Sequence, residues 1–186
     1  MATFADKPTL TGERVVLRPI VAEHAEAMWR DLHDEEALRL TGTQATFDGV
    51  AIEQWAATRA NTPDRLDLAV VDPATGAWVG EAVINEGDLD NRSCNFRIAL
   101  TPSARNRGIG TEATRLIVDY VFEEIEPPMH RISLGVYAFN PRAIAVYERI
   151  GFVREGVARD ALFWDGEFVD EILMAMLRSD HEALRG

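Results

Sequence analysis

The segment from 101 to 115 constrains the fold most, because a proline turn and two glycines lead directly into an amphipathic helix. From Ile109 onward the apolar residues recur at the spacing of one helical face, and a double proline ends the pattern. Gly108 and Gly110 allow a ligand to approach the backbone closely, and the first turn of a helix has N–H groups without intrahelical partners. Because these groups lie at the positive end of the helix dipole, the segment predicts an anion site.

Two arginines strengthen this prediction. Arg105 and Arg107 precede the glycines, and their guanidinium groups match phosphate oxygens in pairs of hydrogen bonds. A glycine pair before a helix is also a common tight turn without a ligand, so the arginines carry much of the inference. We therefore expect a polyphosphate ligand.

Two other phosphate motifs can be tested against the same segment. The chain has no Gly-Lys-Ser/Thr sequence, which excludes a P-loop. Gly108-Ile-Gly-Thr-Glu-Ala113 does fit the G-x-G-x-x-A pattern of Rossmann dinucleotide-binding proteins. In that fold the glycines directly follow a strand and the next strand ends in an acid, whereas here the segment 101–107 intervenes and the next strand ends at Asn140. A Rossmann site is therefore the weaker alternative.

Length and composition predict one domain over residues 1–186, because 47% of the residues are hydrophobic and no low-complexity segment divides the chain. The formal charge of −12 argues against nucleic acid as a partner. Without a long apolar run or a secretory signal, we expect a soluble, cytoplasmic protein that does not use a membrane. The single cysteine, Cys94, is expected to be a packed thiol, and the scattered histidines predict no metal site.

The pattern of apolar residues predicts an α/β (α+β) domain with a twisted, mostly antiparallel sheet of seven strands, one parallel pair and about four helices. The strands are expected at 14–19, 66–71, 78–84, 93–100, 131–139, 153–158 and 168–177. The helices are expected at 22–32, around 50–58, at 109–126 and at 140–150.

Three further local expectations follow from the sequence. The helix around 50–58 should bury Val50, Ala51, Trp55 and Thr58, and the polar segment 34–48 should be a loop that lines an acceptor site. The residues after Arg178 should form a short polar tail. Asp165-Gly166 should be the turn of a final hairpin.

These motifs, in this order, resemble the GNAT superfamily of acyl-CoA-dependent N-acyltransferases over nearly the whole chain. The family's phosphate motif, Gln/Arg-x-x-Gly-x-Gly/Ala, is similar to Arg105-Asn-Arg-Gly-Ile-Gly110, and the segment from Asn140 to Phe152 resembles the second CoA-binding segment. The closing segment from Trp164 to Met174 resembles the branch that contains ribosomal-protein N-terminal, polyamine and aminoglycoside acetyltransferases.

The resemblance implies acetyl-CoA as the co-substrate, no metal, and a wedge between two splayed parallel strands. Asn140 would contact the CoA arm, and Tyr147, two helical turns later, would protonate the departing thiolate. Backbone groups would hold the rest of the cofactor. The pyrophosphate would lie on Arg107, Gly108, Ile109, Gly110 and Thr111, and the pantetheine arm would pair with Ile98, Ala99 and Leu100.

The sequence departs from the family at the general base. Many relatives have a glutamate in the strand before the glycine loop, whereas this chain has Asn95, and an amide is not a base at neutral pH. Glu81 on the neighbouring strand could act through water, with Glu86 a weaker candidate. The departure keeps a second function open, that of a catalytically degenerate, regulatory CoA-binding module.

We expect direct transfer, in a ternary complex, to a primary amine that is either a cationic small molecule or a protein N-terminus. The charge of −12 favours a cationic acceptor. The sequence does not decide between a monomer and a homodimer. The side chains expected around the acceptor are Glu81, Glu86, Asn95, Trp164, Asp165 and Glu167.

Overall fold

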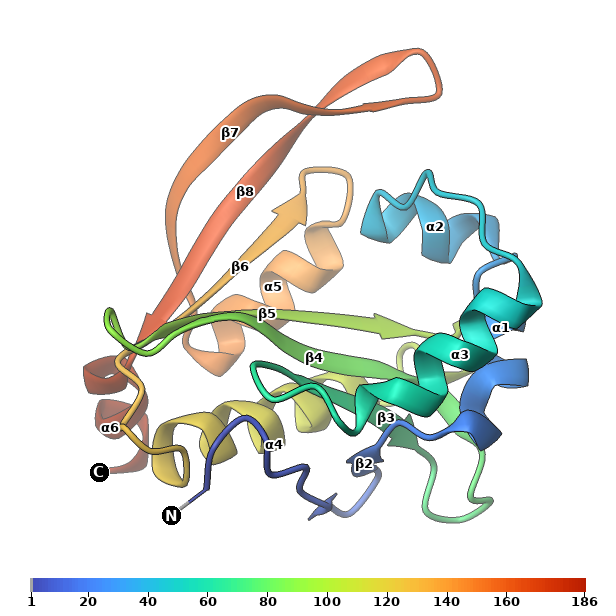
Figure 1. Ribbon diagram of the computed structural model, residues 1–186. Coiled ribbons are helices and arrows are strands. Elements are labelled where there is room, and N and C mark those ends of the chain that lie inside the picture. Colours follow the sequence, from blue (N-terminus) through green and yellow to red (C-terminus); the bar gives the residue numbers. More distant parts are fainter. Residues whose placement is uncertain (1) are drawn as a thin grey trace.

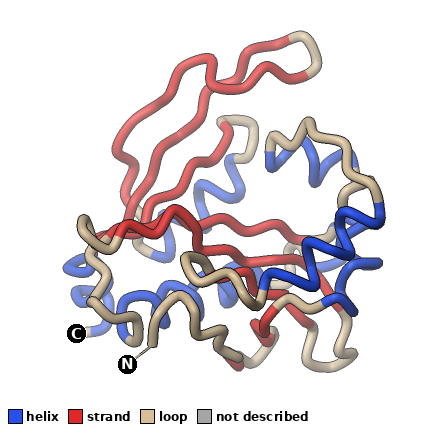
Figure 2. Tube along the Cα trace, viewed as in Figure 1, coloured by secondary structure: helices blue, strands red, loops and turns tan. Residues whose placement is uncertain are grey.

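The computed structural model describes residues 2–186, which form one mixed sheet with helices on both faces (Figures 1 and 2). Its strand order is β1-β2-β3-β4-β5-β6-β8-β7. The strands are β1 (Leu10–Thr11), β2 (Val16–Pro19), β3 (Leu66–Val71), β4 (Trp78–Asp88), β5 (Ser93–Leu100), β6 (Arg131–Tyr137), β7 (Val153–Trp164) and β8 (Glu167–Leu177). The helices are α1 (Ala25–Asp31), α2 (Glu35–Thr41), α3 (Gly49–Arg59), α4 (Ile109–Glu123), α5 (Pro141–Ile150) and α6 (Arg178–Arg185).

The topology confirms the expected fold class. Strands β5 and β6 are parallel, and the other neighbouring strand pairs are antiparallel. A doubly wound Rossmann fold requires a mostly parallel sheet, so the Rossmann alternative is wrong. The eighth strand, which the sequence did not predict, is the two-residue β1 beside β2.

Two helices differ from expectation. The segment expected as a loop contains α2, and the expected polar tail is α6. Asp34 caps α2 by accepting a 2.7 Å hydrogen bond from the Ala37 N–H, and Gly42 ends it in the left-handed region. None of the α2 residues is buried, and α6 buries only His181, so neither helix has the apolar stripe that identifies a helix from sequence.

The apolar core lies on both faces of the sheet. The larger cluster packs α4 and α5 against one face, and it includes Phe96, Ile117 and Leu134. The smaller cluster lies under α1 and α3 on the opposite face, which we call the α3 face. Helix α3 is rotated from the expected orientation, because it buries Ile52 and Ala56 while Val50 is 64% exposed.

Strands β5 and β6 separate soon after they meet. They pair only at Ser93 with Arg131, Cys94 with Ile132, and Asn95 with Ser133. Beyond Asn95 the two strands diverge, and β6 pairs with β8 of the long β7–β8 hairpin, which rises away from β4 and β5 (Figure 1). The hairpin turns at Asp165-Gly166, as expected. The gap between β5 and β6, which we call the wedge, confirms the expected splayed parallel pair.

Candidate active site

The loop before α4 has the backbone conformation that turns N–H groups toward a common point. Asn106 and Gly108 both adopt the left-handed region, with φ values of 62° and 78°, and Gly108 is the N-cap of α4. Such alternating backbone conformations turn successive N–H groups toward one point, and the free N–H groups of the first helical turn add to them. The sequence missed one cation here, because the Arg14 guanidinium lies beside Gly108.

Arg105 and Arg107 already have acidic partners. The Arg105 side chain, 9% exposed, forms ion pairs with Glu36 and Asp34 of the α2 region and donates from Nε to the Leu100 carbonyl at 3.3 Å. Arg107 lies 3.1 Å from Asp72 through Nη2, but about half of its side chain is exposed. The backbone, Arg14 and the exposed part of Arg107 therefore offer the anion site its positive charge, while Arg105 connects the loop to α2.

One edge of β5 has no strand partner beyond Asn95. The Thr101 N–H donates to the Val79 carbonyl of β4 at 3.0 Å, and strand residues alternate in the direction of their backbone groups. Ala99, paired with Glu81, therefore directs its N–H and C=O toward β4, whereas Ile98 and Leu100 direct theirs into the wedge. Of the three residues expected to pair with pantetheine, Ile98 and Leu100 therefore have backbone groups directed into the wedge, although the Leu100 carbonyl already accepts from Arg105 Nε. The backbone groups of Ala99 pair with β4 instead.

Tyr147 lies on the core side of the wedge. Its ring is 8% exposed and makes edge contacts with Phe96, the first β5 residue past the paired segment, and with Phe152. Burial raises the pKa of its hydroxyl to about 12, so the group stays protonated at neutral pH. Asn140 caps the same helix, as predicted, through a 3.2 Å hydrogen bond from the Ala143 N–H to its Oδ1.

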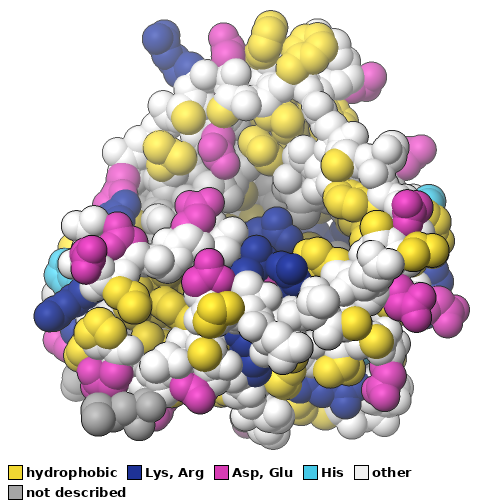
Figure 3. Space-filling view, in the orientation of Figure 1, with side chains coloured by type: hydrophobic (Ala, Val, Ile, Leu, Met, Phe, Trp, Pro, Cys, Tyr) yellow, Lys and Arg dark blue, Asp and Glu magenta, His cyan; other side chains and the backbone are white. Residues whose placement is uncertain are grey.

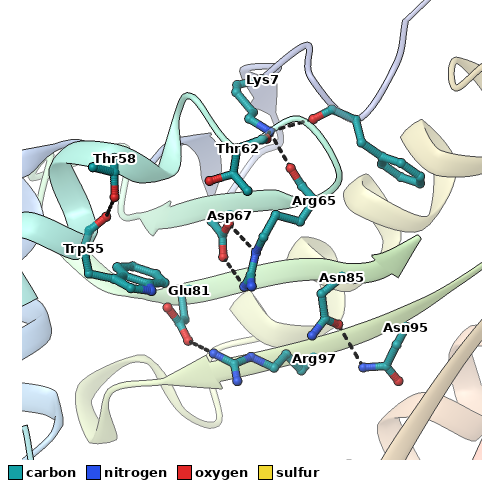
Figure 4. A network of polar contacts seen from close by, with 11 residues as sticks. Lys7, Trp55, Thr58, Thr62, Arg65, Asp67, Glu81, Asn85, Asn95 and Arg97 are labelled. Carbon is teal, nitrogen blue, oxygen red and sulfur yellow. Dashed lines mark hydrogen bonds and ion pairs between the residues drawn. The ribbon is translucent and has the colours of Figure 1, made fainter. Parts of the chain in front are cut away.

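A polar row crosses the opposite, α3 face of the sheet (Figure 4). Glu81 Oε1 accepts a 2.9 Å hydrogen bond from Arg97 Nη2, and Asn85 Oδ1 accepts one of 3.1 Å from Asn95 Nδ2. Burial raises the pKa of the Glu81 carboxyl, and the Arg97 cation opposes that rise. Asn95 stands at the last paired position of β5, so the row begins where the wedge opens.

The acidic residues expected around the acceptor do not all lie at one site. Glu86 lies five strand residues from Glu81, about 17 Å at strand spacing, toward the closed end where β5 pairs with β6. Trp164 and Asp165 lie at the tip of the β7–β8 hairpin, where they line a hollow of about 490 Å³ with the segment that follows α1, with α2 and with the 43–47 loop. The expectation that Glu86 and Asp165 surround one acceptor is therefore wrong.

Sequence reasoning missed three residues that face the wedge from the α3 face. Arg97 follows Asn95 by two positions on β5, and Tyr137 and Glu171 pair across β6 and β8. Strand alternation places all three on the same face as Asn95, since Phe96, Leu134 and Met174 enter the core. Their proximity depends on the strand order of the sheet, which local sequence patterns do not show.

Other reactive groups lie away from the wedge or are unreactive. Cys94 is buried, and burial raises the pKa of its thiol to about 12, which disfavours a nucleophilic thiolate. His181 of α6 lies 2.7 Å from Asp119 of α4, and Arg185 lies 2.7 Å from Glu123 of α4, so these acids already face basic side chains. Within residues 2–186, no helix is both long and apolar enough to cross a membrane.

A family model described as an acetyltransferase (GNAT) domain matches residues 14–153. The probable N-acetyltransferase YjcK of Bacillus subtilis (strain 168) is 40% identical over 83 residues, which are 45% of each protein. The spermidine N(1)-acetyltransferase of Vibrio cholerae is 30% identical over 112 residues, covering 60% of this chain and 64% of that protein. The L-amino acid N-acetyltransferase AaaT of Escherichia coli (strain K12) is 28% identical over 169 residues, which cover 86% of this chain and 98% of that protein.

Thus the chain spans about half the length of YjcK and just under two thirds of the spermidine enzyme. Among solved structures, the spermidine N-acetyltransferase from Vibrio cholerae in complex with CoA and spermine superposes with a TM-score of 0.84. That match covers 92% of this chain and 99% of the other, at 21% sequence identity. The structural likeness establishes the fold.

Proposed function

Since this chain belongs to the GNAT family of acetyl-CoA-dependent N-acetyltransferases, we propose that it transfers the acetyl group of acetyl-CoA to a primary amine by direct attack in a ternary complex. The observation that carries the proposal is the wedge between β5 and β6. It has a free backbone edge on one wall, the N-terminus of α4 at Gly108, and Tyr147 on the core side.

The residues fit the shape and charge of acetyl-CoA. The helix terminus at Gly108 to Thr111, with Arg14 and Arg107 nearby, would bind the pyrophosphate. The backbone groups of Ile98 and Leu100 that face the wedge would pair with the pantetheine amides as an added strand does. One of these free N–H groups would also stabilise the oxyanion of the tetrahedral intermediate.

The reaction would cross the sheet from one face to the other. The amine would approach from the α3 face and form the new N–C bond, and the C–S bond would then break. Tyr147, on the core side, would give its proton to the departing thiolate. The high pKa of Tyr147 supports this role because the hydroxyl carries its proton at neutral pH.

An acceptor amine must be neutral when it attacks, so an ammonium with an ordinary pKa near 10 must first lose a proton. We propose that Glu81 takes this proton through water. Desolvation raises the pKa of its carboxyl, which makes its conjugate base a better proton acceptor than an exposed glutamate. A covalent acetyl-cysteine intermediate is disfavoured by the buried thiol of Cys94.

The acceptor is a primary amine whose reacting group arrives as a cation, on a small molecule or a protein N-terminus. The names of the relatives span spermidine and L-amino acids, so they support amine acetylation and no single acceptor. The overall charge of −12 favours attraction of cations.

Calorimetry and turnover together test the proposal. Acetyl-CoA and CoA should bind more tightly than NAD or ATP, and a panel of primary amines should release CoA with formation of an N-acetyl product seen by mass spectrometry. Tight CoA binding without turnover on any amine would favour the alternative, a catalytically degenerate CoA-binding module. One observation supports that alternative, since Asn95, an amide, stands where the family resemblance implies a glutamate base.

A further inference from the structure

Opposite charges face each other across the open wedge on the α3 face. Arg97 lies two residues past Asn95 on β5, and Gly135 lies two residues past Ser133 on β6. Because Asn95 and Ser133 form the last parallel pair, Arg97 and Gly135 occupy matching positions on the two walls just after the strands separate. The side chain of Glu171 lies over Gly135, so a guanidinium stands on one wall and a carboxylate on the other.

Arg97 leaves most of its hydrogen-bond donors free on the α3 face beside the wedge. Its side chain is 56% exposed and forms one ion pair, through Nη2, with Glu81. The Glu81 side chain is only 16% exposed beneath it, so the surface that a ligand meets here is the guanidinium rather than the carboxylate. Figure 3 shows Lys and Arg side chains gathered in the hollow between the β4–β5 part of the sheet and the β7–β8 hairpin. A guanidinium so placed binds a carboxylate in a planar, two-bond arrangement.

Glu171 is positioned by a small residue on the neighbouring strand. It pairs with Tyr137 across β6 and β8, and its carboxylate extends over Gly135, where any added Cβ would collide with Oε1. Among residues 2–186 no side chain donates a hydrogen bond or forms an ion pair with this carboxylate. Burial, and then the Glu171 charge, raises the pKa of the neighbouring Tyr137 hydroxyl. Glu171 is therefore a free anion at the wedge.

We propose that the acceptor is a small amine that carries a carboxylate or similar acidic group a few bonds from its nitrogen. Its ammonium lies against Glu171, and its acidic group lies on Arg97. The arrangement explains why Arg97 and Glu171 do not pair with each other, since the wedge holds them on separate walls. A polyamine gives Arg97 nothing to bind and brings a second positive charge toward it.

This inference rests on the proposed amine acetylation and narrows its acceptor. It also gives Glu81 a second role, beside that of the proposed base. By holding Arg97 through Nη2, Glu81 fixes the direction of the remaining guanidinium N–H groups, so Glu81 is also a positioning residue for the acidic group of the acceptor.

Matched amines test the inference. For each of three carbon skeletons, steady-state rates are measured for the amino acid, its carboxamide and the amine that lacks the acid, as in phenylalanine, phenylalaninamide and phenethylamine, with spermidine added to the panel. The acidic member should have the highest kcat/KM on the best skeleton, by about tenfold to a hundredfold, the range for a charged hydrogen-bonded pair. Arg97→Gln should remove this preference mainly through KM, because it lowers kcat/KM for the amino acid much more than for the carboxamide, and any loss that all three amines share reports the lost contact with Glu81. Arg97→Lys should restore part of the preference.

Two further variants complete the test. Glu171→Gln should lower kcat/KM for every amine in the panel, because all share the ammonium. Arg159→Gln, which removes one exposed arginine of β7, should change neither the preference nor the rates. Each variant is also checked for CoA binding and thermal unfolding, so that a misfolded protein is recognised.

The outcomes separate this inference from the proposed function. A preference for spermidine or for the carboxamides in the wild-type protein overturns the inference and leaves amine acetylation standing. An acid preference that survives in Arg97→Gln also overturns it. If no amine in the panel is acetylated although CoA binds, the proposed function fails and the inference fails with it.

Discussion

At the scale of single residues, the Tyr147 side chain packs against aromatic rings and makes no hydrogen bond to another of residues 2–186. We expect Tyr147→Phe to lower kcat by roughly tenfold to a thousandfold, the range for loss of a general acid, with little change in CoA affinity. The ring contacts with Phe96 and Phe152 survive the substitution, so the fold should be retained. Single-turnover kinetics and CoA calorimetry on the same preparation measure the two effects, and unchanged turnover would remove Tyr147 from the mechanism.

Glu81 should shape the dependence of activity on pH. The raised pKa of its carboxyl means that the base form appears only as the pH rises through that value, so kcat/KM should climb with pH along this limb. Glu81→Gln should depress kcat/KM at neutral pH and recover partly at high pH, where the acceptor amine deprotonates in solution. A pH profile identical to that of the wild-type protein would exclude the water relay through Glu81.

Sequence predicted these residues unequally, for a physical reason. Asn140, Tyr147 and the glycines lie within continuous motifs, in which local backbone geometry fixes how each residue is presented. Arg97 and Glu171 come from strands far apart in the chain. They face the same wedge only because β8 pairs with β6, the partner of β5. The prediction for Glu86 was wrong because β4 continues past residue 84, so Glu86 lies within the strand, toward the closed end of the wedge.

At the scale of elements, the helix terminus at Gly108 depends on a left-handed backbone. Gly108→Val should abolish CoA binding, because a side chain now blocks close approach of the ligand, and it should also cost about 1–2 kcal/mol, since φ there is 78°. Gly166→Ala is the matched control. This variant strains a similar φ of 85° at the hairpin tip, where an added Cβ meets nothing within 4 Å. It should therefore destabilise the fold without lowering the affinity for CoA measured by calorimetry. Normal CoA affinity in Gly108→Val would contradict the assignment.

The two edges of β5 can be separated by proline scanning. Ile98→Pro removes an N–H that faces the wedge, so it should abolish CoA binding while largely keeping the fold. Ala99→Pro removes an N–H that faces β4 and leaves the Glu81 carbonyl without a donor, which should cost about 1–3 kcal/mol. Denaturant unfolding and CoA calorimetry measure both variants. Equal unfolding midpoints for the two would show that the N–H directions have been misassigned.

Local signals predicted strands and capped amphipathic helices well, but they failed for α2 and α6. Asp34 caps α2, and Asp180 in the first turn of α6 accepts a hydrogen bond from the Leu177 N–H, yet both helices bury almost no apolar surface of their own. Helix α2 packs against both β5 and β6, and its acids hold Arg105. Its place over the wedge is therefore a property of the tertiary fold, which a periodicity search cannot detect.

At the scale of the whole molecule, net charge is a poor guide to the site. The charge of −12 predicts attraction of cationic amines. However, the screening length is about 8 Å at physiological ionic strength, so acids on distant surfaces contribute little at the wedge. Exposed Arg97, the other basic groups in the hollow of Figure 3 and the Glu171 carboxylate set the local potential instead. The sequence gives the sum of the charges, and only the fold gives their arrangement.

The sheet has two parts that are joined by a short parallel contact, and this arrangement predicts strong stabilisation by the cofactor. Strands β1 to β5 and strands β6 to β8 are connected within the sheet only by three paired positions of β5 and β6. A CoA molecule that fills the wedge contacts both parts and binds only the folded protein. At a CoA concentration one hundred times Kd, the free energy of unfolding should therefore rise by about 2.7 kcal/mol, which corresponds to roughly 5–11 °C in Tm for a chain of this size. Thermal unfolding with CoA, with NAD and without ligand measures this, and Gly108→Val serves as the binding-deficient control. A comparable shift with NAD, or a CoA shift that persists in Gly108→Val, would contradict CoA binding in the wedge.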